Sequence, residues 1–139
     1  MLVGISSNSL VVKKDACYAL KNFTFCAECH MLEDFYLKNR EVVRHLVDNL
    51  DEAFDNIVTP SLGTLENLLY VFEKDRERTD VSGKRLNLVL EDCKELNLGI
   101  LKEKLSSSNE VVQTISTRMW NTYFEGVDGF YNENGGFDL

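Results

Sequence analysis

The chain has 139 residues, of which 44% are hydrophobic and 27% are charged, as is typical of one globular domain. Its formal net charge is -8 and no basic stripe is present, which argues against binding to nucleic acid. A single proline and eight glycines favour long helices over a turn-rich β fold.

The N-terminal run MLVGISSNSL does not have the features of a targeting segment, because it lacks a basic leader and its apolar run is short. No stretch approaches the roughly 18 apolar residues of a membrane-spanning helix. We therefore expect a cytoplasmic protein without a transmembrane anchor. In that compartment the four cysteines are expected to be reduced thiols.

Apolar residues recur at helical spacings of three and four in the first half of the chain. The first stripe consists of Val12, Ala16, Ala19, Leu20, Phe23, Cys26 and Ala27. The second consists of Val43, Leu46, Val47, Leu50, Phe54 and Ile57. We expect the second helix to begin near Asn39 and to end before Thr59-Pro60, because a residue before proline disfavours the helical region.

Two further stripes follow in the middle of the chain. The third consists of Leu62, Leu65, Leu68, Leu69 and Phe72. The charged stretch EKDRERTD after it predicts a helix end and a solvated connection. The fourth consists of Leu86, Val89, Leu90, Cys93, Leu96 and Ile100, and Gly99 weakens its last turn.

Near the C-terminus, Ser107 and Glu110 have the spacing of a capping box, which predicts the start of a fifth helix. One face of that helix carries Val112, Ile115, Met119 and Tyr123. Gly126 and Gly129 then separate short terminal helices. The whole pattern predicts one all-α domain over residues 1–139, folded as a helical bundle with short connections.

The run Cys26-Ala27-Glu28-Cys29-His30 has the C-x-x-C-H spacing of c-type haem attachment, which places two thioethers and an imidazole on one helical turn. Haem attachment requires export, and no export signal is present. Zinc held by Cys26, Cys29, His30 and His45 is an alternative, although this is not a standard finger spacing. The favoured interpretation is structural, with Cys26 on the core stripe, so we expect no cofactor and no metal.

Signatures of catalysis are scarce, and we expect that the protein is not an enzyme. The two histidines lack the flanking residues that mark a nucleophile–base pair. Ser82-Gly83-Lys84 lacks the upstream glycine of a phosphate-binding loop. The acid pairs Asp51-Glu52 and Glu91-Asp92 are adjacent in sequence and so do not share a helical face.

The C-terminal segment 130–138, FYNENGGFD, matches the pattern W-I-x-E-N-G-G-W-D. Its identical residues are Glu133, Asn134, Gly135, Gly136 and Asp138. Phe130 and Phe137 replace the tryptophans. Asn-Gly-Gly gives a sharp joint between short helices, which an ordinary helix–turn–helix ending also uses. The pattern is the second Bcl-homology motif, and the chain therefore resembles the B-cell lymphoma-2 (Bcl) family of apoptosis regulators.

The segment 81–90, VSGKRLNLVL, resembles the first homology motif of that family, V-N-W-G-R-I-V-A-F-F. Arg85 falls on the family's arginine, which pairs with an aspartate of a bound ligand helix, and Ser82 would lie near the same acid. Gly83-Lys84 stands where Trp-Gly is usual. The later F-x-F-G-G is replaced by the residues at 90–94, LEDCK.

A third similarity lies at 46–54, LVDNLDEAF, which resembles the motif L-x-x-x-G-D-E through Leu46, Asp51 and Glu52. Leu50 replaces a small residue, and its bulk favours a groove wall over a ligand helix. The similarity covers about residues 40–139. The long loop and the membrane tail of many cellular members are missing, as in compact viral members.

The resemblance implies a Bcl-type bundle of seven or eight helices around a central helix that starts near Arg85. It also implies an inhibitor of apoptosis, which sequesters pro-apoptotic proteins by binding their amphipathic Bcl-homology-3 helix in a hydrophobic groove. The helices at 40–58, 62–74 and 85–100 would form this groove. The residues expected to bind the partner helix are Arg85, Ser82, Phe54, Ile57, Leu65, Leu68, Leu69, Phe72, Leu86 and Val89. The apolar ones also lie on core stripes, so core packing is the expected role at any single one of them.

The partners implied are pro-apoptotic host proteins met in the host cytosol, with recruitment to mitochondria through them. An empty apolar groove is also a surface for homodimer formation. Two other function classes stay open. One is a Bcl-fold viral modulator of another host signalling pathway, and the other is a zinc- or haem-binding helical protein.

Overall fold

The computed structural model describes residues 2–79 and 86–125, and all the regular structure in these ranges is helical. The α-helices are α1 (Leu2–Ile5), α2 (Leu10–Cys26), α3 (Cys29–Lys38), α4 (Val42–Asn49), α5 (Asp55–Thr79), α6 (Leu88–Cys93), α7 (Gly99–Glu103) and α8 (Glu110–Met119). A 3-10 turn, η1 (Lys104–Ser106), follows α7, and a π-helical turn, η2 (Trp120–Phe124), follows α8. The all-α prediction is confirmed for these residues.

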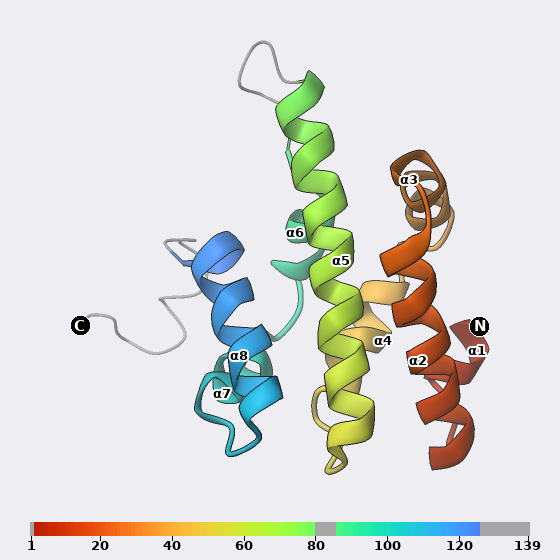
Figure 1. Cartoon of the computed structure of the whole chain (residues 1–139), viewed down its shortest axis with the longest axis vertical. Helices are drawn as coiled ribbons and strands as arrows, with labels where there is room; N and C mark the ends of the chain where they lie inside the picture. The colour runs from red at the N-terminus through yellow and green to blue at the C-terminus, as the bar shows by residue number, and fades with distance from the viewer. Residues whose placement is uncertain (1, 80–85, 126–139) are drawn as a thin grey trace.

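The long helix α5 occupies the centre of the molecule and contacts α2, α3, α4, α6 and α8 (Figure 1). Its first turn is fixed by the carbonyl of Phe54, which accepts hydrogen bonds from the amides of Ile57 and Val58. The expectation that the central helix starts near Arg85 is wrong. The helix in that part of the chain, α6, starts at Leu88 and has only six residues.

The proline does not end a helix where the sequence suggested. Pro60 lies inside α5, and the chain breaks instead at residues 50–54, between α4 and α5. Proline removes the amide that would bond to the carbonyl of Asn56, but Asn56 is exposed and water can take that place. Burial of Ile57 and Leu62 on either side holds the helix together across the proline.

Three helices form a front layer in which all run in the same direction. Ser61 of α5 contacts Cys17 of α2, and Asn67 further along α5 contacts Thr24 further along α2. Asp55 and Glu66 of α5 likewise meet Asn109, at the start of α8, and Arg118, near its end. Figure 1 shows α2, α5 and α8 side by side, each starting at the lower end.

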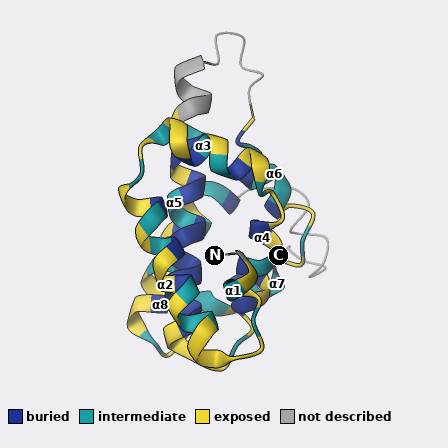
Figure 2. Cartoon of the chain, turned by 90° about the vertical axis from the view of Figure 1, so that its right-hand side faces the viewer, coloured by how far each residue is buried: buried dark blue, intermediate teal, exposed yellow. Residues whose placement is uncertain are grey.

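The back layer consists of α4, α6 and α7, on the opposite side of α5 from the viewer of Figure 1. The helix α3 crosses one end, where the rings of Tyr36 and Phe72 meet edge to face at 5.2 Å. Figure 2 shows the buried segments gathered between the two layers and the exposed ones on the outside. The core is therefore the space between the inward face of α5 and the back layer.

Three local expectations are corrected by hydrogen bonds of asparagine. Asn39 ends α3, where its side chain donates to the carbonyl of Phe35, and α4 begins only at Val42. The fourth stripe is divided into α6 and α7, because Asn97 accepts from the amide of Gly99 at 2.9 Å and turns the chain. The N-cap of α8 is Asn109, which accepts from Val112, and not Ser107.

The first stripe is only partly buried. On α2 the buried positions are Cys17, Leu20 and Thr24, whereas Val12 and Cys26 are exposed. Along the described part of the chain, no helix combines the length and the apolar character needed to cross a membrane.

Candidate helix-binding site

Most of the expected pocket residues form the core between α4, α5 and α6. The side chains that are at most 4% exposed are Ile57, Leu65, Leu68, Leu69, Phe72 and Val89. Four of them lie within two turns on the inward face of α5, and Val89 of α6 belongs to the same buried cluster. In this structure these residues hold the layers together and do not line an open groove.

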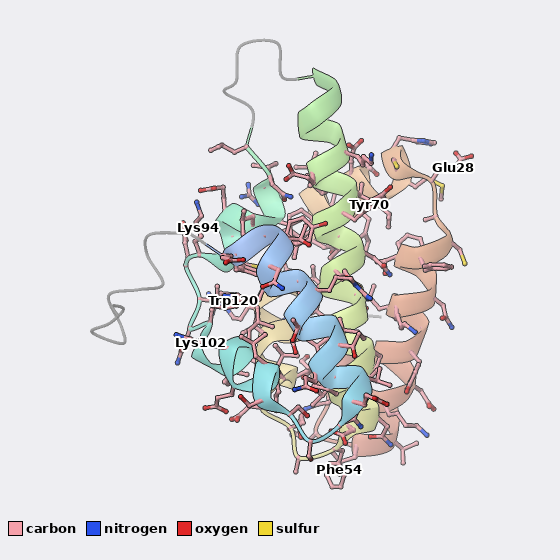
Figure 3. All side chains as sticks on the ribbon, turned by 60° about the vertical axis from the view of Figure 1, so that its left-hand side comes forward. Glu28, Phe54, Tyr70, Lys94, Lys102 and Trp120 are labelled. Carbon is pink, nitrogen blue, oxygen red and sulfur yellow. The ribbon has the colours of Figure 1, made fainter. Side chains whose placement is uncertain are left out.

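The other two expected apolar residues are exposed and lie far apart. Phe54 is 49% exposed at the start of α5, and Leu86 is 61% exposed before α6. Asn87, the residue after Leu86, donates a hydrogen bond to the carbonyl of Leu69 in α5. At a rise of about 1.5 Å per residue, Leu69 lies about 22 Å along α5 from Phe54. Figure 3 shows Phe54 at the lower end of the molecule.

The two polar residues expected to bind the partner, Arg85 and Ser82, lie outside the described residues, and so does the terminal motif at 130–138. The nearest described residue that fixes this part of the chain to α5 is Asn87. Its buried amide donates to the carbonyl of Leu69 at 3.0 Å and to Oε1 of Glu73 at 3.2 Å, and its Oδ1 accepts from the amide of Leu90. One side chain thus caps α6 and fixes the start of α6 against α5.

A polar cluster that sequence reasoning missed joins α3, α6 and the connection before α4. Asp92 accepts two hydrogen bonds from the guanidinium of Arg40, at 3.0 and 2.6 Å, and one from the hydroxyl of Tyr36 at 2.5 Å. Burial, followed by the hydrogen bond to Asp92, raises the pKa of Tyr36. Nothing local in the sequence marks this cluster, because Asp92 lies 52 and 56 residues from its partners.

Beside this cluster lies an open hollow of about 260 Å³ between the start of α4 and the residues after α6. Its lining includes Val43 and Leu96, but also Arg40, Arg44 and Glu95. The hollow lies between two of the segments from which the groove was expected, 40–58 and 85–100. The carboxylates of Glu41 and Asp92 also line it, so the hollow mixes both charges with apolar side chains and does not fit the whole apolar face of a helix.

The segment that resembles the third homology motif is packed into the molecule. Leu46 and Leu50 are fully buried. Asn49, which lies between these two leucines, donates a hydrogen bond to the carbonyl of Ile5 at 3.1 Å. Glu52, which follows them, forms an ion pair with Lys13 of α2 at 2.5 Å. Asp51 and Phe54 of this segment are exposed, but because Leu46, Leu50, Asn49 and Glu52 are engaged inside the chain, it is not a free ligand helix.

The geometry of the C-x-x-C-H run does not fit haem attachment. Cys26 is the last residue of α2 and Cys29 is the first of α3, so the two thiols are not on one helical turn. Ala27 and Glu28 between them are extended, at φ/ψ of -72/152 and -70/154. Three such residue steps separate the two Cα atoms by about 9 Å. This also exceeds the roughly 7 Å limit for a disulfide.

The expected zinc ligands are not brought together either. The imidazole of His30 is exposed and lies 3.6 Å from Glu28, whereas His45 is on α4. Over residues 2–79 and 86–125, no three histidine, cysteine, aspartate or glutamate side chains are arranged to hold a metal ion. The other two cysteines are buried, and burial raises the pKa of Cys93 to about 12, which leaves it a packing residue.

Comparison with known proteins does not assign the chain to a family: no family model matches it, and no curated protein matches it.

Proposed function

We propose that this protein is an inhibitor of apoptosis that sequesters pro-apoptotic proteins by binding their amphipathic Bcl-homology-3 helix. The observation that carries the proposal is the burial of Leu46 and Leu50 in the segment that resembles the third homology motif. A pro-death member of the family offers this segment as a ligand, whereas here it is part of the core. The similarity at Arg85 and at 130–138 supports the same family, and the all-helical architecture is compatible with it.

The partner helix would bind where α4, α5 and α6 meet. The apolar side chains there are packed, so binding requires α6 to move away from α5. The helix α6 has only six residues, and the side chain of Asn87 joins its start to α5 through a hydrogen bond. The hollow beside Arg44 would receive one end of the partner helix, and Arg85 would pair with its aspartate.

This proposal is tested by calorimetric titration with a panel of synthetic Bcl-homology-3 peptides. Arg85→Ala is expected to weaken the tightest complex by about 2–5 kcal/mol, because it leaves an unpaired aspartate in the interface. Arg85→Lys is also expected to weaken it, since an ammonium cannot replace a bidentate guanidinium.

The matched control is Lys102→Ala, which removes an exposed cation of α7 and should leave the affinity unchanged. Circular dichroism checks that each variant keeps its helices. If wild-type protein binds no peptide of the panel, the proposal fails. If binding occurs but Arg85→Ala has no effect, Arg85 is a surface charge and the site lies elsewhere.

In this proposal the protein acts in the cytosol of a host cell and reaches mitochondria through its partners. Self-association through the same groove would compete with peptide binding. Sedimentation velocity with and without peptide measures it, because a groove-mediated dimer must dissociate when the peptide binds.

A second candidate function is modulation of another host signalling pathway through a different surface of the same bundle. The observation that favours it is an open groove on the outward side of α5, remote from α4 and α6. Binding to that groove without binding to any Bcl-homology-3 peptide would support this second function over the first.

A further inference from the structure

The outward side of α5 carries a groove that the sequence motifs do not predict. It consists of two adjoining hollows of about 430 and 380 Å³, which share Glu66, Asn67 and Arg118. α5 forms the floor of both hollows (Figure 1). The larger hollow has α2 and α8 as its walls, and the smaller one is bounded by α8 and η2. Because the three helices run side by side, the groove follows the axis of α5, as a docked helix would require.

Aromatic side chains stand exposed along this groove. Phe25, on the α2 wall, is 78% exposed, and Tyr70, on the floor, is 55% exposed. Figure 3 shows Tyr70 on the upper half of α5. Exposed aromatic side chains beside a hollow are typical of recognition surfaces, because they gain the most from losing contact with water.

The charges within the groove are not balanced. Arg118 and Glu66 form a two-point ion pair across the floor, at 2.5 and 2.8 Å, which neutralises both. The alkyl chain of Lys21 packs over Gly63, and a Cβ atom added at Gly63 would lie 3.1 Å from the Cε atom of Lys21. In the part of the chain that the structure describes, the ammonium of Lys21 has no carboxylate partner.

The groove therefore presents the unpaired cation of Lys21 at one end, with Phe25 and Tyr70 further along it, in a protein whose formal net charge is -8. The net negative charge repels an acidic partner from the surface on average, whereas the unpaired ammonium of Lys21 attracts a carboxylate to this groove. Charge complementarity thus selects a segment that is apolar on one face and carries a carboxylate at its edge.

We propose that this groove docks an amphipathic helix of a partner protein, with its apolar face against Phe25 and Tyr70 and a carboxylate paired with Lys21. This is the groove of the second candidate function, and it is separate from the site proposed for the Bcl-homology-3 helix, because it lies on the opposite side of α5 from α4 and α6. The partner's helix would become the fourth member of the front layer and cover the exposed side of α5.

The probe is a pair of synthetic fluorescein-labelled helical peptides of about 14 residues, long enough to span four turns. Both carry leucines spaced three and four residues apart, flanked by glutamates in one peptide and by lysines in the other. Fluorescence anisotropy with the full chain should show tighter binding of the glutamate peptide.

Two substitutions test the site itself. Phe25→Ser should weaken binding of the glutamate peptide roughly tenfold or more, because it removes an aromatic anchor. Lys21→Glu should weaken it roughly three- to tenfold and improve binding of the lysine peptide, because the charge at the edge is reversed. The matched controls are Leu37→Ser on α3, where the leucine is 55% exposed, and Lys102→Glu on α7.

The two proposals fail separately. Arg85→Ala should leave the glutamate peptide's affinity unchanged, whereas Phe25→Ser should leave binding of the Bcl-homology-3 panel unchanged. Equal binding of the two peptides, or equal loss in the Leu37→Ser and Phe25→Ser variants, would overturn the docking site. A dimer that dissociates on Phe25→Ser would also overturn it, because a second copy of the chain would then be the occupant.

Discussion

The two sides of α5 differ in how far their side chains are buried. The inward side carries Leu65, Leu68 and Phe72, which are at most 4% exposed and pack against the back layer and α3. The outward side carries Gly63, Glu66 and Tyr70, which line the groove beside α2, α8 and η2, and the ammonium of Lys74 lies over the ring of Tyr70. The apolar stripe that predicts the helix therefore identifies the side that packs into the core. The proposed partner helix would bind on the other side, where the groove lies.

The largest expected effect comes from shortening a side chain on the inward side. Leu68→Ala should lower the free energy of unfolding by about 2–5 kcal/mol, because the leucine is fully buried and leaves a cavity. Tyr70→Ala on the outward side should change it by less than about 1 kcal/mol, since the ring is largely in solvent. Urea unfolding of both variants measures the difference, and similar losses would mean that both sides are core.

A smaller effect is expected where the inward side is fixed to α6. Asn87→Ala should destabilise the fold by about 1–3 kcal/mol, because the carbonyl of Leu69 loses a buried donor and α6 loses its cap. Asn97→Ala, which removes an exposed turn bond to Gly99, is the control and should have less effect. Amide exchange in α6 should accelerate only in Asn87→Ala.

The hydrogen bond of Tyr36 to Asp92 tests the edge of the back layer. Tyr36→Phe should cost about 1 kcal/mol at neutral pH. The folded pKa of Tyr36 lies above the ordinary value of about 10, so its contribution to stability is present below that pH and is lost as pH rises above it. Alkaline unfolding should therefore be shallower in Tyr36→Phe. An identical pH dependence in both proteins would contradict the assignment.

The smallest effect is expected on the outward side, at the ion pair between Arg118 and Glu66. Both groups are partly exposed, at 56% and 21% of their side chains, and water screens their attraction. A double-mutant cycle with Glu66→Gln and Arg118→Gln should give about 0.2–1 kcal/mol of coupling. A coupling as large as the effect of Asn87→Ala would mean that the groove floor is structural.

The sequence predicted the packing positions of α5 because their signal is local. The burial of Leu65, Leu68, Leu69 and Phe72 follows from apolar residues three and four positions apart. The break at 50–54 and the passage of α5 through Pro60 did not follow. Both depend on tertiary packing around these residues. That packing outweighs the tendency of the residue before proline to avoid the helical conformation.

The candidate sites were less predictable than the core, for a related reason. Asp92 meets Arg40 and Tyr36, and Glu66 meets Arg118, across more than 50 residues of sequence. Pairs at such separations have no spacing rule, so a single sequence does not reveal them. The homology-like motifs, in contrast, are contiguous and could be found, although Arg85 and the segment 130–138 lie outside the described residues.

The parallel front layer has a consequence for how the chain reaches this structure. Neighbouring helices of an up-and-down bundle meet through short turns, but α2 and α5 meet between Cys17 and Ser61, and α5 and α8 meet between Asp55 and Asn109. Each of these contacts closes a loop of more than 40 residues before it gains any stability. Because contacts distant in sequence slow folding, this all-helical chain should fold more slowly than an antiparallel bundle of its length.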